Sequence, residues 1–314
     1  MIIMVLILIM HEEEIKMWLK LFDKIVWDTA RKSDAETHAR QVKPEGIKEV
    51  CNLAYIEDDT WQHKLDVYYP EENENDKLPV IIDIHGGGWM YGDKELNKFY
   101  NLYLAKRGFC VFSMSYSLVP DCPDPAYELR EVMQALKWIS ENMKHYPADE
   151  SKIMLTGDSA GGMLAAFAAS LLTDANLRKV YNTVDVDMKL TVLALTSPVA
   201  YMRSGGFVGF YAKKMWTQGY KNTPIHHYMN LDEVIANAEI PPTFMVTSSG
   251  DMLGLKQTRR AAEDFRKKGI EVELMDWPKY EGQNLPHVFS VLEPNLKPGI
   301  DTIDAMCAFY RNHF

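Results

Sequence analysis

The sequence contains few cysteines, and they form no pattern. The four cysteines of the 314-residue chain show no C-x-x-C pair and no metal-site spacing; they are Cys51, Cys110, Cys122 and Cys307. The nine histidines also lack the H-E-x-x-H arrangement of zinc enzymes. We therefore expect buried thiols in a reducing, cytoplasmic compartment, with no bound metal and no organic cofactor.

Basic residues are also fewer than acidic ones. The chain has 34 Lys and Arg against 44 Asp and Glu, which gives a net charge of -10. This balance argues against nucleic acid as a partner, and it provides no attraction to anionic membranes or polyanionic substrates. The apolar fraction of 47% and the charged fraction of 25% are ordinary globular values, so neither disorder nor a membrane bundle is indicated.

A hydrophobic run long enough to cross a membrane is likewise absent. The apolar segment Ile2 to Met10 has the length of a signal-peptide core, but no Lys or Arg precedes it and no small-residue cleavage site follows it. We expect a buried terminal segment and no membrane partner. A cryptic anchor or signal, or a start assigned too early, are the alternatives.

The first 70 residues combine a helical pattern with two strands. Apolar residues recur at three- and four-residue steps from Glu12 to about Arg31 and predict an amphipathic helix, whereas residues 31–45 predict a polar loop. Strands of antiparallel character follow at 50–56 and 64–69, and the alternating second one predicts a half-solvated edge hairpin. We assign residues 1–45 to an N-terminal helical segment that forms part of a cap.

Strands and helices alternate from residue 78 onward, which predicts βαβ units, a mostly parallel sheet and helices on both of its faces. The expected strands are 78–84, 110–114, 153–155, 190–195, 243–246 and 272–277. The expected helices are 126–143, 162–172, 255–268 and 299–312. We therefore expect one α/β domain over residues 46–314.

The longest interruption of this alternation is an insertion at about 200–240. It is rich in aromatic residues and histidines, namely Tyr201, Phe207, Phe210, Tyr211, Trp216, Tyr220, His226, His227 and Tyr228. Long excursions in compact domains are usually functional, so we interpret it as a cap over a site. A satellite core under a long loop is the alternative.

A G-D-S-A-G turn around Ser159 joins an expected strand to an expected helix. Gly157 and Gly161 flank the serine by two residues, as in the nucleophile elbow, where a sharp turn leaves no room for a Cβ and exposes the hydroxyl. The motif alone is weak evidence, because a glycine-rich turn with a solvated serine has the same pattern. The H-G-G-G-W string from His85 to Trp89 strengthens it, since a glycine run after a parallel strand can turn N–H groups toward a ligand, as an oxyanion hole requires.

Together these two glycine motifs, with the segment Tyr116 to Pro120 between them, resemble the hormone-sensitive-lipase family of α/β-hydrolase esterases. The resemblance runs from about Leu78 to the C-terminus and implies an α/β-hydrolase fold that hydrolyses small-molecule carboxylic esters. It implies a triad of Ser159 as nucleophile, His287 as base and Asp251 as the orienting acid. By analogy, the N–H groups of Gly87, Gly88 and Ala160 form the oxyanion hole.

The chain departs from the family pattern at several positions. Ser117 stands where the family commonly has arginine, Met252 stands where proline is usual, and the segment before His287 is long. These changes leave the chemistry intact but weaken any transfer of substrate preference. Asp276 is the rival for the acid, whereas Asp158 and His85 are expected to hold local structure.

Several functions fit this pattern. The cap elements favour esters of short to medium acyl chain. An arylformamidase-like amidase, an esterase acting on acetyl or feruloyl groups of polysaccharides, and a non-catalytic ligand-binding protein on the same fold are alternatives. A homodimer is left open.

Overall fold

The computed structural model describes residues 17, 27–203, 209, 211, 215, 216 and 218–314. The predicted buried segment Ile2 to Met10 lies outside the described residues, as do most of the predicted helix from Glu12 to Arg31 and the aromatic residues Phe207 and Phe210. Among the described residues, no helix has both the length and the apolar character needed to cross a bilayer.

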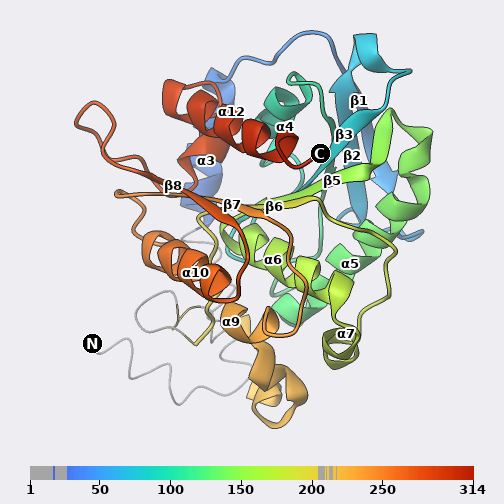
Figure 1. Ribbon diagram of the computed structural model, residues 1–314, viewed down its shortest axis with the longest axis vertical. Helices are drawn as coiled ribbons and strands as arrows, with labels where there is room; N and C mark the ends of the chain where they lie inside the picture. Colours follow the sequence, from blue (N-terminus) through green and yellow to red (C-terminus); the bar gives the residue numbers. More distant parts are fainter. Residues whose placement is uncertain (1–16, 18–26, 204–208, 210, 212–214, 217) are drawn as a thin grey trace.

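The core of the fold is one eight-stranded sheet with the order β1-β2-β4-β3-β5-β6-β7-β8 (Figure 1). β1 and β2 pair antiparallel, as do β2 and β4, and all other neighbours are parallel. The predicted mostly parallel sheet is therefore confirmed. The strands are β1 (Ile47–Ala54), β2 (Lys64–Pro70), β3 (Leu78–Ile84), β4 (Cys110–Met114), β5 (Ala148–Asp158), β6 (Val192–Thr196), β7 (Thr243–Ser248) and β8 (Val272–Trp277).

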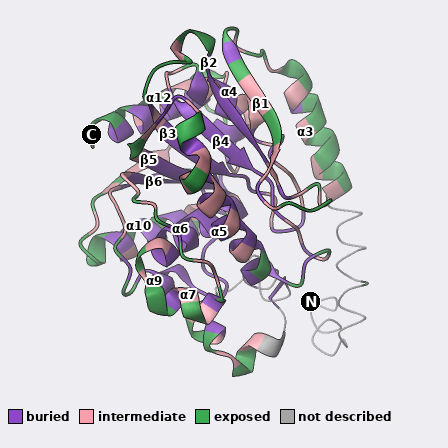
Figure 2. Ribbon diagram, turned by 90° about the vertical axis from the view of Figure 1, so that its right-hand side faces the viewer, coloured by how far each residue is buried: buried purple, intermediate pink, exposed green. Residues whose placement is uncertain are grey.

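Helices cover both faces of this sheet and bury its central strands (Figure 2). One face packs against α5 (Pro125–Asn142), α6 (Ser159–Thr173) and α10 (Leu255–Lys267), and the other against α4 (Lys98–Ala105) and α12 (Lys297–Arg311). The remaining described α-helices are α3 (Asp28–Arg40), α7 (Ala175–Tyr181), α9 (Leu231–Val234) and α11 (Phe289–Leu292). The four helices predicted after residue 78 are present within a few residues, whereas α4, α7, α9 and α11 were not predicted.

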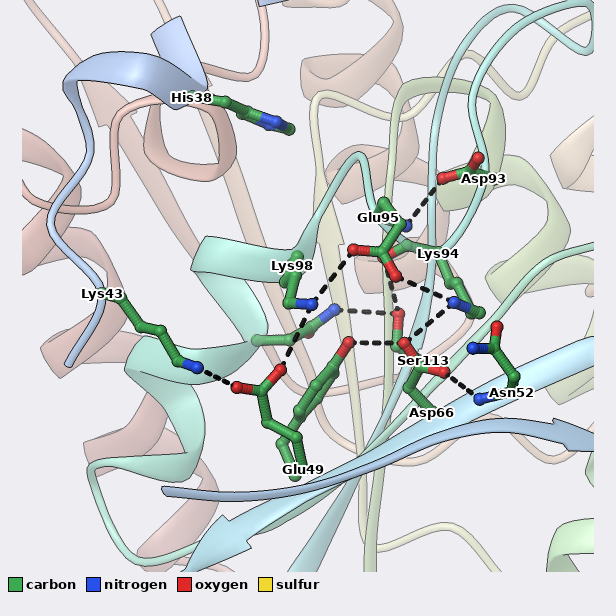
Figure 3. A network of polar contacts seen from close by, with 12 residues as sticks. His38, Lys43, Glu49, Asn52, Asp66, Asp93, Lys94, Glu95, Lys98 and Ser113 are labelled. Atoms are coloured by element: carbon green, nitrogen blue, oxygen red, sulfur yellow. Dashed lines mark hydrogen bonds and ion pairs between the residues drawn. The ribbon is translucent and has the colours of Figure 1, made fainter. Parts of the chain in front are cut away.

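The predicted antiparallel hairpin does lie at the edge of the sheet, but the half-solvated face predicted for β2 is wrong, because β2 lies between β1 and β4 and is buried from Leu65 onward. Asp66, one of the polar residues that suggested a solvated face, is buried and has polar partners instead (Figure 3). Asp66 accepts hydrogen bonds from the Tyr68 hydroxyl at 2.8 Å and the Asn52 N–H at 2.7 Å, and it forms an ion pair with Lys94 at 3.0 Å. Paired polar groups can be buried, so alternation alone does not indicate solvent.

The predicted loop at residues 31–45 is also wrong, since α3 is helical through most of it. α3 is mostly exposed and presents no apolar stripe from which a sequence pattern could reveal it (Figure 2). Polar contacts hold it in place: the Tyr91 hydroxyl donates to Asp34 at 2.8 Å, and His38 Nε2 lies 3.1 Å from the carbonyl oxygen of Leu96. These contacts place α3 beside the loop that follows β3.

The expected burial of the cysteines holds for three of the four. Cys51 is exposed because it lies on the edge strand β1, beside a register shift between Val50 and Leu53. All four thiols are free of disulfide bonds.

The insertion between β6 and β7 contains two short 3-10 helices, Gln218–Asn222 and Pro224–Tyr228, and then α9. Its described part has two kinds of contact. Trp216 is buried in the main hydrophobic core, whereas Tyr211 donates a hydrogen bond to the carbonyl oxygen of Gly88 at 2.9 Å. The insertion is therefore both part of the core and a neighbour of the glycine loop.

Candidate active site

Ser159 lies where β5 ends and α6 begins, with a left-handed backbone (φ of 52°). The turn is tight because the strand and the helix approach each other closely. A Cβ on Gly157 would lie 2.4 Å from the carbonyl oxygen of Gly161, and a Cβ on Gly161 would lie 2.1 Å from that of Ile84. Only glycine fits at these two positions, and the strained turn directs the serine hydroxyl outward.

Three predicted residues meet at this turn. His287, in the loop between β8 and α11, places Nε2 at 2.9 Å from Ser159 Oγ. Its Nδ1 lies 2.7 Å from Oδ1 of Asp251, which follows β7. When Nδ1 donates its proton to the carboxylate, Nε2 is left to accept the serine proton.

Asp251 is buried and held by several donors. Its Oδ1 accepts the N–H groups of Leu253 at 3.1 Å and Gly254 at 2.7 Å, and its Oδ2 accepts the Thr247 hydroxyl at 3.2 Å. Burial acts to raise the pKa of Asp251, but the bonds from His287 and the Gly254 N–H outweigh it, so this pKa lies below its ordinary value. The carboxylate is thus ionised and correctly placed for an imidazole.

The rival acid, Asp276, lies elsewhere. It forms an ion pair with Arg259 on the surface at 2.7 Å. The structure does not bring it to the histidine.

The glycine loop after β3 borders the same site. Gly87 and Gly88 have positive φ angles of 108° and 57°, and a Cβ on Gly87 would lie 1.8 Å from the carbonyl oxygen of Tyr91. Both glycines line one cavity together with Ser159 and Ala160. Backbone N–H groups from two segments are thereby available on one side of the serine.

A buried polar network under this loop was only partly predicted. Asp158 Oδ1 accepts the Gly86 N–H at 2.9 Å and the Asn97 amide at 2.8 Å, and the same amide donates to Asp83 Oδ2 at 3.1 Å. Burial raises the pKa of Asp158, and burial together with the Asp158 charge raises that of Asp83 to about 7. The sequence predicted local bonds for Asp158, whereas Asp83 and Asn97 were missed; an acid inside the apolar run of β3 was the only available signal.

His85 is completely buried, and its ring stacks on Tyr116 with 4.4 Å between centroids. Burial lowers the pKa of His85 to about 4, so the ring is neutral. These contacts agree with the prediction that His85 holds local structure.

The cavity in front of Ser159 has a volume of about 390 Å³ and walls that are mainly apolar. Trp27 and Ala30 reach it from the N-terminal side, and Tyr211 reaches it from the insertion. Other apolar wall residues are Trp89, Leu96, Val199, Leu253, Val288 and Leu292. The volume is in the usual range for small ligands. Within the described part of the chain, no group of three or more His, Cys, Asp or Glu side chains could hold a metal ion.

Comparisons with known proteins agree with this geometry. The family model BD-FAE matches residues 65–203. Carboxylesterase NlhH of Mycobacterium tuberculosis is 28% identical over 222 residues, which cover 68% of each chain. Bovine arylacetamide deacetylase is 33% identical over 140 residues, 42% of this chain and 32% of that one.

Among solved structures, esterase B from Lactobacillus rhamnosis superposes with a TM-score of 0.88 at 28% identity, covering 96% of both chains. An esterase from Pyrobaculum calidifontis shares the fold, with a TM-score of 0.69 at 19% identity and 92% of both chains covered.

The sheet order, the elbow and these likenesses define an α/β hydrolase. The chain is similar to carboxylesterases of the hormone-sensitive-lipase-like kind and is a serine hydrolase of carboxylic esters.

Proposed function

We propose that Ser159 is the nucleophile, His287 the general base and Asp251 the residue that orients the imidazole. The observation that carries this proposal is the continuous hydrogen-bond chain from Asp251 through His287 to Ser159, at the wall of an apolar cavity. His287 takes the serine proton as Oγ attacks the ester carbonyl, and then gives it to the leaving alcohol. Water hydrolyses the acyl-serine intermediate by the same route.

The N–H groups of Gly87, Gly88 and Ala160 stabilise the negative oxygen of the tetrahedral intermediate in this mechanism. Support comes from their common position around the cavity and from the positive φ angles that turn the loop. The triad and this oxyanion hole need no metal or organic cofactor for the reaction.

A fluorophosphonate probe tests the nucleophile. We expect one label per chain, on the peptide that contains Ser159, and no label on Ser159→Ala. His287→Ala should label far more slowly, because the hydroxyl loses its base. Labelling at another serine would show that the nucleophile is wrongly assigned, whereas a folded chain that stays unlabelled would support a non-catalytic binding protein.

We propose that the substrates are small esters with short to medium acyl chains, up to about eight carbons in an ordinary ligand cavity. The N-terminal segment and the insertion act as the cap in this proposal, supported by the contacts of Trp27 and Tyr211 with the cavity. The solved structure of esterase B with a C4-C4 tributyrin phosphonate concerns a similarly short acyl chain in a structural relative.

Amide hydrolysis is the second candidate function. It is favoured by the similarity to arylacetamide deacetylase, which is confined to 42% of this chain. Comparing kcat/KM for phenyl acetate, an ester, with kcat/KM for acetanilide, the corresponding amide, tests it directly.

We also propose a cytoplasmic location, supported by the four free cysteines.

A further inference from the structure

The turn that follows β6 contacts both Ser159 and the loop of Asp251. β6 lies between β5, which leads to Ser159, and β7, which leads to Asp251 (Figure 1). The Val199 N–H, in this turn, donates to the carbonyl oxygen of Ser159 at 3.0 Å. Pro198 lies against Gly162 in the first turn of α6, where a Cβ on the glycine would be 3.1 Å from Pro198 Cα. The turn therefore supports the nucleophile from behind.

Ser197, the first residue of the same turn, lies against the acid loop. A Cβ on Gly254 would be 2.8 Å from Ser197 Cβ and 2.5 Å from Asp251 Oδ2, so the serine and the carboxylate border the same small space. The Ser197 N–H donates to the carbonyl oxygen of Val246 at 2.8 Å. Ser197 is thus fixed beside the acid through its backbone.

The Ser197 hydroxyl is a buried polar group. Ser197 is 1% exposed, and its Oγ has no hydrogen-bond partner at ordinary geometry among the residues that the structure describes. Asp251 Oδ2 accepts the Thr247 hydroxyl at 3.2 Å, and a carboxylate oxygen can accept a second hydrogen bond. A donor this close stabilises the ionised acid: burial acts to raise the pKa of Asp251, and the Ser197 hydroxyl adds to the larger effects of His287 and the Gly254 N–H that lower it.

The backbone at Ser197 is strained. Its φ is 49°, in the left-handed region that costs free energy for a residue with a Cβ. Trp89, Ser159 and Val288 also have positive φ angles, and all three line the catalytic cavity. Ser197 is not a wall residue of that cavity, so contact with substrate does not account for its strain. The strained turn instead places its side chain beside Asp251.

We propose that Ser197 is a positioning residue, whose hydroxyl donates to Asp251 Oδ2 during catalysis and so keeps Oδ1 turned toward His287 Nδ1. Hydrogen bonds of this kind often tighten only in the complex with substrate. With Oδ2 held, the carboxylate does not rotate away from the imidazole, whose tautomer and orientation depend on it. The proposal rests on the proposed function, because it assigns a support for the acid of that triad.

Two substitutions separate the hydroxyl from the backbone. Ser197→Ala removes the hydroxyl and keeps the Cβ, and we expect kcat on p-nitrophenyl acetate to fall about 5- to 50-fold with KM unchanged, the loss of one hydrogen bond to a charged group. Ser197→Gly also removes the hydroxyl but relieves the left-handed strain, and its kcat should fall equally. Ser170→Ala is the matched control, because this buried serine bonds to the Ala166 carbonyl oxygen far along α6, and its kcat should equal that of the wild type.

A double variant shows whether Ser197 acts through Asp251. In an Asp251→Asn background, Ser197→Ala should cause no further loss, because the carboxylate that it positions is already gone. The rate of fluorophosphonate labelling at Ser159 measures this, since traces of wild-type protein would appear as a separate fast fraction. Each kcat is referred to the sites labelled at completion, so unfolded chains do not imitate a loss.

Three results would overturn the proposal: a wild-type kcat in Ser197→Ala, a loss in Ser197→Ala that Ser197→Gly restores, or a full additional loss in the double variant. An Asp251→Asn variant with wild-type kcat would instead show that the proposed function has the wrong acid. Impairment of Asp251→Asn without impairment of Ser197→Ala would leave that function intact and remove only the role of Ser197.

Discussion

In the proposed mechanism, one proton moves between Ser159 and His287, and Asp251 orients the imidazole that accepts it. Because nucleophile and base act as one unit, Ser159→Ala and His287→Ala should each lower kcat by about 10³-fold or more. Asp251→Asn should also be severely impaired, since the amide favours the wrong imidazole tautomer. Asp276→Asn serves as the control for a surface acid, and a larger loss there than at Asp251 would show that the acid is wrongly assigned.

Asp158 joins the elbow to the glycine loop through its bond to the Gly86 N–H. Asp158→Ala removes this bond, so we expect kcat to fall about 10- to 100-fold with little change in KM, because the oxyanion donors lose their alignment. Asp158→Asn keeps an oxygen acceptor and should retain most of the activity. Steady-state kinetics of both variants on p-nitrophenyl acetate check this; equal kcat values for the two would remove the positioning role.

Asp83 makes folding stability depend on pH. Its pKa is about 7 in the folded chain against an ordinary value of 3.8, so between these values the folded state binds a proton that the unfolded state has lost. This contribution is fully present below about pH 4 and is lost as the pH rises through about 7. Urea unfolding from pH 5 to 8 should show it. Asp83→Asn, which cannot ionise, should flatten the decline, and an unchanged slope would contradict the assignment.

The catalytic candidates could be found from sequence because each lies in a short motif of special backbone or special residue type, as Ser159 does between two glycines. Asp83 and Asn97 could not. Their partners are 14 or more residues away along the chain, and a single polar residue in an apolar strand gives no indication of what it contacts.

At the scale of elements, β3 could be predicted from its own sequence, whereas α3 could not. β3 was predicted to the residue, because a strand buried on both faces is a continuous apolar run. α3 depends on contacts with a distant loop, and nothing in its own composition indicates that loop. Short helices such as α11 were missed because four residues carry too little periodicity.

The segment before α3 sets acyl length in the proposed cap. Trp27 lines the catalytic cavity and stacks on Tyr91 with 5.3 Å between ring centroids. Trp27→Ala should therefore move the optimum of p-nitrophenyl esters, tested from two to sixteen carbons, toward longer chains. Trp61→Ala, which lies outside this cavity, is the matched control and should leave the optimal acyl length unchanged. A steady rise in kcat/KM to the longest ester with the intact protein would contradict the closed-cap interpretation.

The whole molecule carries a net charge of -10, which affects how substrates approach it. An anionic ester such as acetylsalicylate should be repelled at low salt, so its kcat/KM should rise by a few fold between about 0.01 and 0.5 M ionic strength as screening increases. Neutral phenyl acetate provides the comparison, and its kcat/KM should stay constant.

The overall architecture was predictable because strand–helix alternation allows few topologies, whereas the position of β2 inside the sheet required knowledge of its buried partners.

The carbonyl of Gly88 accepts a bond from Tyr211, and a Cβ at Gly88 would lie 2.9 Å from the Trp27 ring. In the proposed mechanism these two side chains therefore support the loop that carries the oxyanion N–H groups. A displacement of Trp27 or Tyr211 would then also displace those N–H groups. We therefore expect that a loss of these contacts reduces turnover even for esters that reach the serine freely.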